Sequence, residues 1–148
     1  MVFRETEWGF PRAAVPDVVR AIDAWVRRSH EHVPFPVEVR VGAADDPWLS
    51  TAHGRDTGWV AVHQYHRMPH QRYFAAVAAI AAEHGGRPHW GKPAPARRRA
   101  LRTLYPRFDD AVAVRDRVDP AGVFANPYLD RVLGRTPDRV DRAARTAG

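Results

Sequence analysis

The chain has 148 residues, a 45% apolar fraction and five tryptophans, which indicates one folded domain with a single core and argues against disorder. It contains no cysteine, so disulfides, thiolate metal ligands and cysteine nucleophiles are excluded. The net charge of +6 raises the possibility of a nucleic-acid ligand, but the arginines are scattered along the chain, and we expect no nucleic-acid partner.

The sequence has no pattern typical of a membrane span or of a secretory signal. Its apolar runs are far shorter than the ~20 residues that a transmembrane helix needs. Residues 1–11 lack the basic-then-apolar order of a signal peptide. We therefore expect a cytoplasmic protein without a transmembrane segment.

The first two predicted strands are residues 2–10 and 34–41. Residues 2–10 alternate loosely between apolar and polar side chains. In the second segment, alternate positions are Val37, Val39 and Val41. Because alternate side chains of a strand point to opposite faces, we expect the valines to pack against a helix. Glu38 and Arg40 then lie together on the other face, about 7 Å apart along the strand.

Residues 58–66 are the third predicted strand, and its two faces differ. Val60 and Val62 share one face, which we expect to contact the helices. His63 and Tyr65 share the opposite face, which we expect to stay uncovered. A histidine on a strand is more often structural than catalytic, so His63 by itself leaves both interpretations open.

Helical periodicity occurs in four segments, residues 15–29, 71–84, 95–105 and 108–118. Residues 124–129 are interpreted as an extended turn, and the polar residues 135–148 as a frayed tail. The order of strands and helices predicts an α+β fold, in which an antiparallel sheet has its helices packed on one face.

Residues 85–92, Gly-Gly-Arg-Pro-His-Trp-Gly-Lys, follow the second predicted helix and gather several chemically useful side chains. The two glycines end a helix well, and Pro88 favours an extended segment that presents His89, Trp90 and Lys92. Lys92 is the single lysine among the 23 basic residues. A compact ammonium differs from a guanidinium in hydration and shape, which favours a specific task for Lys92.

The uncovered face of the predicted sheet therefore carries Glu38, Arg40 and His63, with Lys92 on a loop that can reach the same side. One interpretation is a half-solvated face with an exposed ion pair worth under ~1 kcal/mol. The other is a ligand-binding face. The sequence has no glycine-rich phosphate loop, no HExxH and no Gly-x-Ser-x-Gly, and its histidines lack metal-ligand spacing, so no metal site is expected.

Several motifs of the chain occur in the same order in one known family. They are Val37-Glu38-Val39-Arg40, Gly54-Arg55-Asp56, Ala61-Val62-His63, the segment 85–92, Tyr105-Pro106-Arg107, Asp119-Pro120 and Asn126-Pro127-Tyr128-Leu129. Residues 1–134 resemble the C-terminal substrate (cap) domain of the D-arabinono-1,4-lactone oxidase, L-gulono-1,4-lactone oxidase and alditol oxidase family. The members of this family are FAD enzymes of the vanillyl-alcohol oxidase type.

The resemblance implies a reaction and roles for individual residues. In such enzymes a substrate alcohol is oxidised by hydride transfer to flavin N5, and O₂ reoxidises the flavin to give hydrogen peroxide. By resemblance, Glu38 and Arg40 bind the substrate hydroxyls. Lys92 is the catalytic residue near the reacting carbon, where it stabilises developing negative charge.

The resemblance also assigns His63 and His89 to the substrate pocket and Asn126 to the flavin edge. The family's flavin-binding domain has no counterpart in these residues, so we expect FAD to be bound mainly by a separately encoded partner domain. Many relatives have a histidine soon after the lysine, where this chain reads Pro93-Ala94-Pro95.

Several alternatives stay open from the sequence. The chain is interpreted as one half of a split enzyme, an inactive remnant or a gene-model fragment. A stand-alone polyol or sugar-acid binding module without redox chemistry is a different class of function, and a basic nucleic-acid-associated domain is a third. An uncovered ligand face also makes self-association a prospect.

Overall fold

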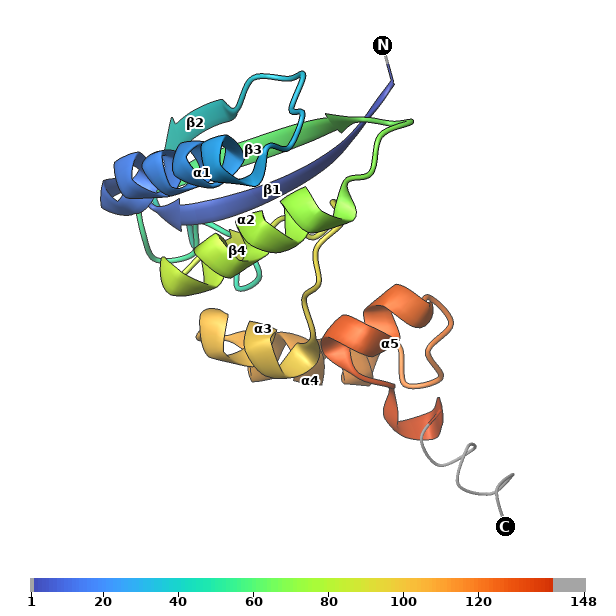
Figure 1. Ribbon diagram of the computed structural model, residues 1–148. Helices are drawn as coiled ribbons and strands as arrows, with labels where there is room; N and C mark the ends of the chain where they lie inside the picture. Colours follow the sequence, from blue (N-terminus) through green and yellow to red (C-terminus); the bar gives the residue numbers. More distant parts are fainter. Residues whose placement is uncertain (1, 140–148) are drawn as a thin grey trace. The chain divides into compact units, whose positions relative to one another are not determined.

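The computed structural model describes residues 2–139 (Figure 1). It divides the chain into two compact units, Met1–Pro95 and Ala96–Gly148, where the sequence analysis expects a single core. The first unit contains the sheet and two α-helices. The second unit contains the α-helices that follow residue 96.

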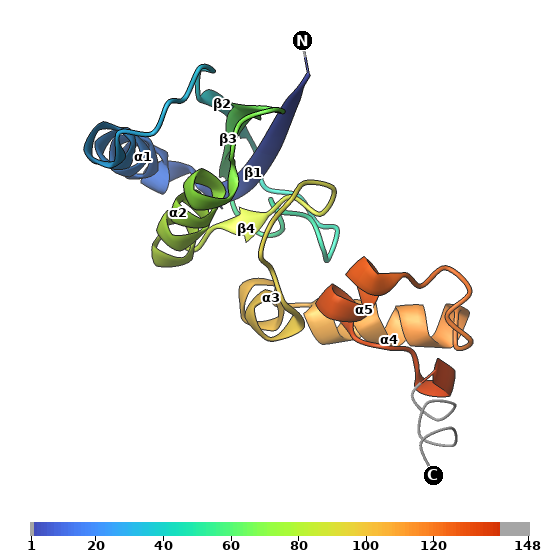
Figure 2. The same ribbon diagram turned by 45° about the vertical axis from the view of Figure 1, so that its right-hand side comes forward.

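The first unit is a four-stranded antiparallel sheet in the order β2-β3-β1-β4. Its strands are β1 (Phe3–Pro11), β2 (Glu38–Gly42), β3 (Thr57–Tyr65) and β4 (Arg87–Pro88). Its helices are the short 3₁₀ helix η1 (Arg12–Ala14), α1 (Val15–Ser29) and α2 (Gln71–Glu83). Helices α1 and α2 lie on the same face of the sheet in both views (Figures 1 and 2). The predicted α+β class is confirmed, and we call the opposite side the open face.

The core of the first unit lies between the sheet and the two helices. Its fully buried members include Phe10, Val18, Ile22, Val60, Val62, Tyr73, Val77 and Ala81. The predicted direction of Val60 and Val62 is therefore confirmed, because both belong to this cluster. The same alternation turns His63 and Trp59 to the open face.

The prediction that the valines of the second strand pack against a helix is wrong for two of them. Val39 is 46% exposed and Val41 is 59% exposed, while Val37 is partly buried against the core. The reason is that β2 is an edge strand, with β3 as its only neighbour in the sheet. The helices cover the central strands, so alternation in β2 specifies a face without guaranteeing burial.

The two glycines after α2 end the helix as the sequence predicts. Gly85 has a φ of +63°, in the left-handed region that a side chain resists, and the Gly86 amide donates to the Ala81 carbonyl at 2.7 Å. A Cβ at Gly86 would lie 2.8 Å from both Ala81 and Phe10, so the second glycine allows close packing. The chain then enters β4, where Pro88 pairs with Trp8 of β1.

The second unit contains α3 (Arg98–Leu104), α4 (Phe108–Val118) and α5 (Pro127–Leu133). Its buried side chains are Leu101, Tyr105, Phe108, Val112, Val132 and Thr136. The range 108–118 is confirmed, whereas α3 starts three residues later than the predicted 95. Arg97 is extended there, and prolines 93 and 95 favour extended backbone before the helix.

The prediction of an extended turn over residues 124–129 is wrong from Pro127 onward, where α5 begins. Asn126 is the N-cap of this helix, and its side chain accepts a hydrogen bond from the Leu129 amide at 3.0 Å. In the predicted tail, Arg139 pairs with Asp130 at 2.8 Å, and residues 140–148 lie outside the described residues.

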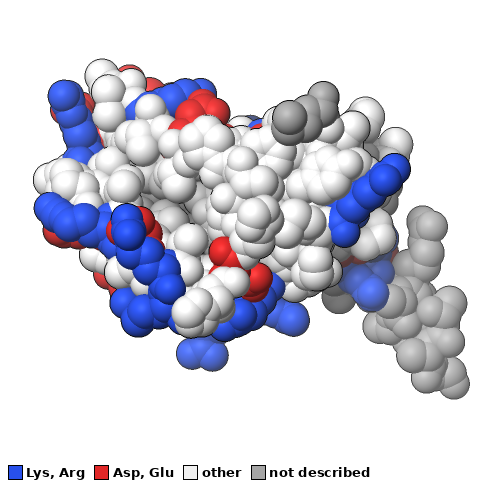
Figure 3. All heavy atoms as spheres, turned by 45° about the horizontal axis from the view of Figure 1, so that its top comes forward, with Lys and Arg blue, Asp and Glu red and all other residues white. Residues whose placement is uncertain are grey.

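Among the described residues, no helix is long and apolar enough to cross a membrane. On the face drawn in Figure 3, basic side chains are scattered and several lie beside acidic ones. Two such pairs lie along α1, where Arg20 contacts Asp17 at 3.0 Å and Arg27 contacts Asp23 at 2.8 Å. Pairing of this kind locally offsets the positive charge of the helix surface.

Tyr73 of α2 gives the first unit an expected sensitivity to alkaline pH. The residue is 1% exposed and stacks on Trp25 at 5.7 Å, and burial raises the pKa of its phenol to about 12. The unfolded chain releases this proton near pH 10, so its contribution to stability is complete below pH 10 and is lost as the pH rises toward 12.

We expect Tyr73→Phe to remove this effect. The free energy of unfolding of the unmodified chain should fall by about 2 kcal/mol more than that of the variant between pH 9.5 and 11.5. Urea denaturation followed by tryptophan fluorescence at both pH values measures the difference. Equal losses in the two proteins would show that Tyr73 is not the responsible group.

Candidate functional site

The open face of the sheet carries charged side chains on β1 and β2 and the His63 imidazole on β3. Residues that pair across an antiparallel sheet share a face, so the strand register fixes which side chains meet. The facing sets are Glu5 with His63, Glu7 with Ala61 and Glu38, and Gly9 with Trp59 and Arg40. The predicted placement of Glu38, Arg40 and His63 on one face, opposite the helices, is confirmed, although the His63 side chain is only 12% exposed.

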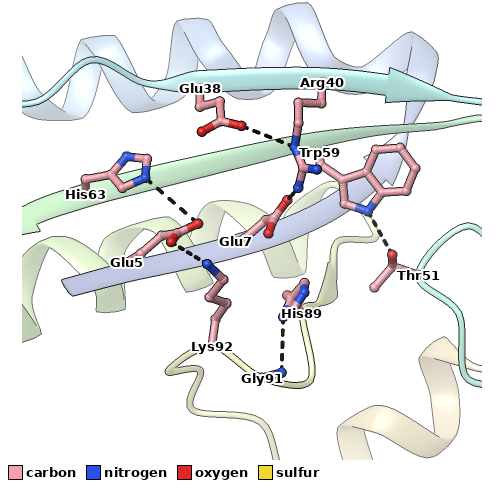
Figure 4. A network of polar contacts seen from close by, with 10 residues as sticks. All are labelled: Glu5, Glu7, Glu38, Arg40, Thr51, Trp59, His63, His89, Gly91 and Lys92. Atoms are coloured by element: carbon pink, nitrogen blue, oxygen red, sulfur yellow. Dashed lines mark hydrogen bonds and ion pairs between the residues drawn. The ribbon is translucent and has the colours of Figure 1, made fainter. Parts of the chain in front are cut away.

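Arg40 is the first cation of this face, and it contacts two carboxylates (Figure 4). Its guanidinium donates a hydrogen bond to Glu7, whose side chain is only 2% exposed. Its Nε lies 3.2 Å from Glu38 Oε1, in a pair whose two side chains are both about half exposed. The guanidinium thus joins a buried carboxylate of β1 to an exposed one of β2.

Lys92 is the second cation, and its ammonium donates a hydrogen bond to Glu5 Oε2. The other oxygen of this carboxylate lies 3.9 Å from His63 Nε2. All three side chains are partly buried, with exposed fractions of 30% for Lys92, 16% for Glu5 and 12% for His63. Lys92 therefore reaches the face that carries Glu38, Arg40 and His63, as the sequence analysis expects.

The segment after β4 brings Lys92 to the sheet. The His89 amide donates to the Glu7 carbonyl at 3.0 Å, which extends the pairing with β1 by one more residue. The Lys92 amide then donates to the His89 carbonyl at 3.2 Å in a tight turn. The His89 ring caps this turn, because its Nδ1 accepts from the Gly91 amide at 3.1 Å. His89 lies beside the charged side chains and supports the turn that carries Lys92 (Figure 4).

An indole lies next to Arg40 on the same face. The guanidinium carbon of Arg40 is 5.9 Å from the Trp59 ring centre, and Trp59 Nε1 donates to Thr51 Oγ1 at 2.8 Å. The ring has glycines on both sides, since a Cβ at Gly42 or Gly9 would lie 3.0 or 3.2 Å from it. The absence of a side chain at these two positions lets the indole lie close to the sheet backbone.

Sequence reasoning missed Glu5 and Glu7, the partners of both cations. Their signal was present, because two carboxylates two residues apart in a strand must share a face. Between them lies Thr6, which is 1% exposed, and Trp8 on the same side is 6% exposed. Thr6 and Trp8 face the helices, and the alternation of the strand therefore turns the two glutamates to the opposite face, where Glu7 is also buried.

Asn126 belongs to the second unit, where its side-chain oxygen caps α5. This contact gives Asn126 a local structural task, and its assignment to a flavin edge stays a prediction. Within residues 2–139, no group of three or more histidine, aspartate or glutamate side chains is arranged to hold a metal ion.

A family model described as D-arabinono-1,4-lactone oxidase matches residues 1–132. The chain belongs to the D-arabinono-1,4-lactone oxidase family. Over 132 residues it is 47% identical to an L-gulono-1,4-lactone dehydrogenase of Mycobacterium tuberculosis, a match that covers 89% of this chain and 31% of the relative.

Two further relatives of this chain are matched over a similar share of their length. An alditol oxidase of a Streptomyces species is 35% identical over 132 residues, covering 87% of this chain and 31% of the relative. An L-gulonolactone oxidase of Bos taurus is 32% identical over 132 residues, covering 86% and 30%. The chain thus spans about 30% of the length of these relatives.

Proposed function

We propose that the chain is the substrate-binding part of an FAD-dependent oxidoreductase that oxidises a CH–OH group of a sugar lactone or alditol, with O₂ as acceptor. The observation that supports the proposal best is the joint placement of Glu38, Arg40 and Lys92 on the open face in a chain of this family. The remaining parts of such an enzyme would come from polypeptide beyond these residues.

The charges of the face favour a neutral, polyhydroxylated ligand. Arg40 and Lys92 are each paired with a carboxylate, so neither cation presents an uncompensated charge to an anion. Guanidinium and carboxylate groups offer many donors and acceptors within a few ångströms, and hydroxyl groups can act as both. A lactone or alditol therefore suits this face better than the negatively charged sugar acid formed when a lactone hydrolyses.

In the proposed reaction, Glu38 and Arg40 bind and orient the hydroxyl groups of the substrate. The Lys92 ammonium donates a hydrogen bond that stabilises the negative charge developing on the substrate oxygen. His63 contacts the carboxylate that holds Lys92, and His89 supports the turn before it. Each of these residues acts on the substrate or on the position of a side chain that does.

The residues of this chain do not fit the task of holding FAD themselves. The flavin supplies the hydride acceptor in this chemistry, and a glycine-rich loop that leads into a helix N-terminus commonly binds a dinucleotide pyrophosphate. The sequence has no such loop, and the Asn126 oxygen is engaged by the Leu129 amide. We therefore propose a separate flavin-binding partner and derive no catalytic step through the flavin.

A chimera tests this proposal directly. The segment of the M. tuberculosis relative that matches residues 1–132 would be replaced by this chain, and the product purified with its flavin. We expect oxidation of L-gulono-1,4-lactone or an alditol, followed both as peroxide release and as reduction of an artificial electron acceptor.

The unaltered relative, prepared in parallel, controls for the assay and for flavin loading. A folded, flavin-containing chimera that oxidises none of a panel of lactones and alditols would contradict the proposed function. Binding of these compounds without oxidation would instead support the non-redox polyol-binding module.

A further inference from the structure

Glu5 has contacts that the proposed roles of its neighbours do not explain. It lies on β1, and its two carboxylate oxygens face two different side chains, the Lys92 ammonium and the His63 imidazole. The Lys92 segment comes from 87 residues later in the chain, so this contact joins two distant parts of the sequence. Glu5 is thus the link between the turn after β4 and the open face.

The side chains around Glu5 hold it in place. His63 is its cross-strand partner, and the His63 ring packs edge-on against Phe3 at 5.0 Å. The exposed fraction of Glu5 is only 16%. A carboxylate with so little freedom can restrain a lysine, whose four-carbon stem otherwise samples many rotamers.

Lys92 needs such a restraint. Its neighbour on one side is Gly91, and the next residue is Pro93, so no regular element fixes the direction of its side chain. In the described part of the chain, the contact that orients its ammonium is the one with Glu5 (Figure 4). Loss of the carboxylate would leave the ammonium free to turn into solvent.

We propose that Glu5 is a positioning residue that holds the ammonium of Lys92 over the open face. The inference deepens the proposed function, on which the catalytic value of Lys92 rests. The contact itself is a property of this chain and can be measured without flavin or substrate.

The single lysine makes the measurement unambiguous. The purified 148-residue chain is treated with N-succinimidyl acetate, an uncharged reagent, and acetylation of Lys92 is compared with that of the α-amino group by peptide mass spectrometry. The reagent must reach the Lys92 nitrogen, which contact with Glu5 holds at 30% exposure of the side chain. We expect Glu5→Gln to raise the ratio about twofold to fivefold, because the amine loses the contact that holds it against the sheet.

Glu38→Gln is the matched control, because it removes one carboxylate from the same face without touching Lys92. We expect it to change the ratio by less than about 1.5-fold, since exposed charges are well screened. An unchanged ratio in a folded Glu5→Gln variant, or an equal rise in Glu38→Gln, would overturn the proposal.

A second measurement needs no variant and decides the question if Glu5→Gln does not fold. A carbodiimide adds no spacer, so it joins a carboxylate only to an amine that can approach it to bonding distance. We expect the unmodified chain to form an amide between Glu5 and Lys92, and a chain that yields no such product would overturn the proposal. An inactive chimera together with this cross-link would refute the proposed function and leave the positioning role intact.

Discussion

Replacing Lys92 with methionine in the chimera is expected to lower kcat at least about a hundredfold while KM changes less than about threefold. Methionine has nearly the same length but no charge, so it removes stabilisation of the negative charge that develops only in the transition state. Steady-state rates over a range of lactone concentrations, at matched flavin content, measure both constants.

Two comparisons make this result specific. Lys92→Arg retains a positive charge but replaces a compact ammonium with a planar guanidinium, and we expect it to restore little of the lost rate. Arg20→Met removes an exposed cation of α1 that pairs with Asp17, and it should leave kcat unchanged. Retained turnover in Lys92→Met would refute the catalytic role of this lysine.

The helices show what local sequence can specify. The predicted ranges 15–29 and 108–118 coincide with α1 and α4, because their apolar spacing and their end residues agree. Helix α5 has an equally local signal, although residues 124–129 were predicted to form an extended turn. Asparagine before proline is favourable for an N-cap followed by the first helical position, and this is how Asn126 and Pro127 are used.

The strands show where local sequence stops being sufficient. Alternation correctly separated Glu38 and Arg40 from the valines, but it could not reveal that β2 lies at the edge of the sheet. Whether Val39 is buried or exposed depends on where the helices lie relative to that edge, and this is a non-local property. The same pattern in the central strand β3 was sufficient to predict buried Val60 and Val62.

The sequence was sufficient to predict the two cations of the site but not the β1 carboxylates that pair with them. Lys92 was distinctive as the single lysine, and Arg40 through the Val-Glu-Val-Arg motif. The spacing of Glu5 and Glu7 places them on one face, but only the register of β1 with β3 sets them opposite His63 and Ala61. Pairing between strands depends on the whole sheet, so a carboxylate's cation is rarely evident from its own segment.

Arg40→Met is expected to lower the free energy of unfolding by about 2–3 kcal/mol. Glu7 is 2% exposed, and without Arg40 its carboxylate stays buried without the guanidinium that pairs with it. We place the effect below that of a fully buried pair because the Arg40 side chain is itself 56% exposed. Urea denaturation of the isolated chain, followed by tryptophan fluorescence, gives the midpoint and its shift.

The double variant identifies the cause of this loss. If the cost of Arg40→Met comes from the stranded charge of Glu7, then Glu7→Gln combined with it should recover at least about 1 kcal/mol relative to simple additivity. Glu38→Gln serves as the control, because both side chains of its 3.2 Å pair with Arg40 are about half exposed. Its coupling to Arg40→Met should stay below about 0.5 kcal/mol. Strict additivity of the Glu7 and Arg40 variants would mean that the guanidinium stabilises the sheet by packing over Trp59, and that Glu7 tolerates burial without it.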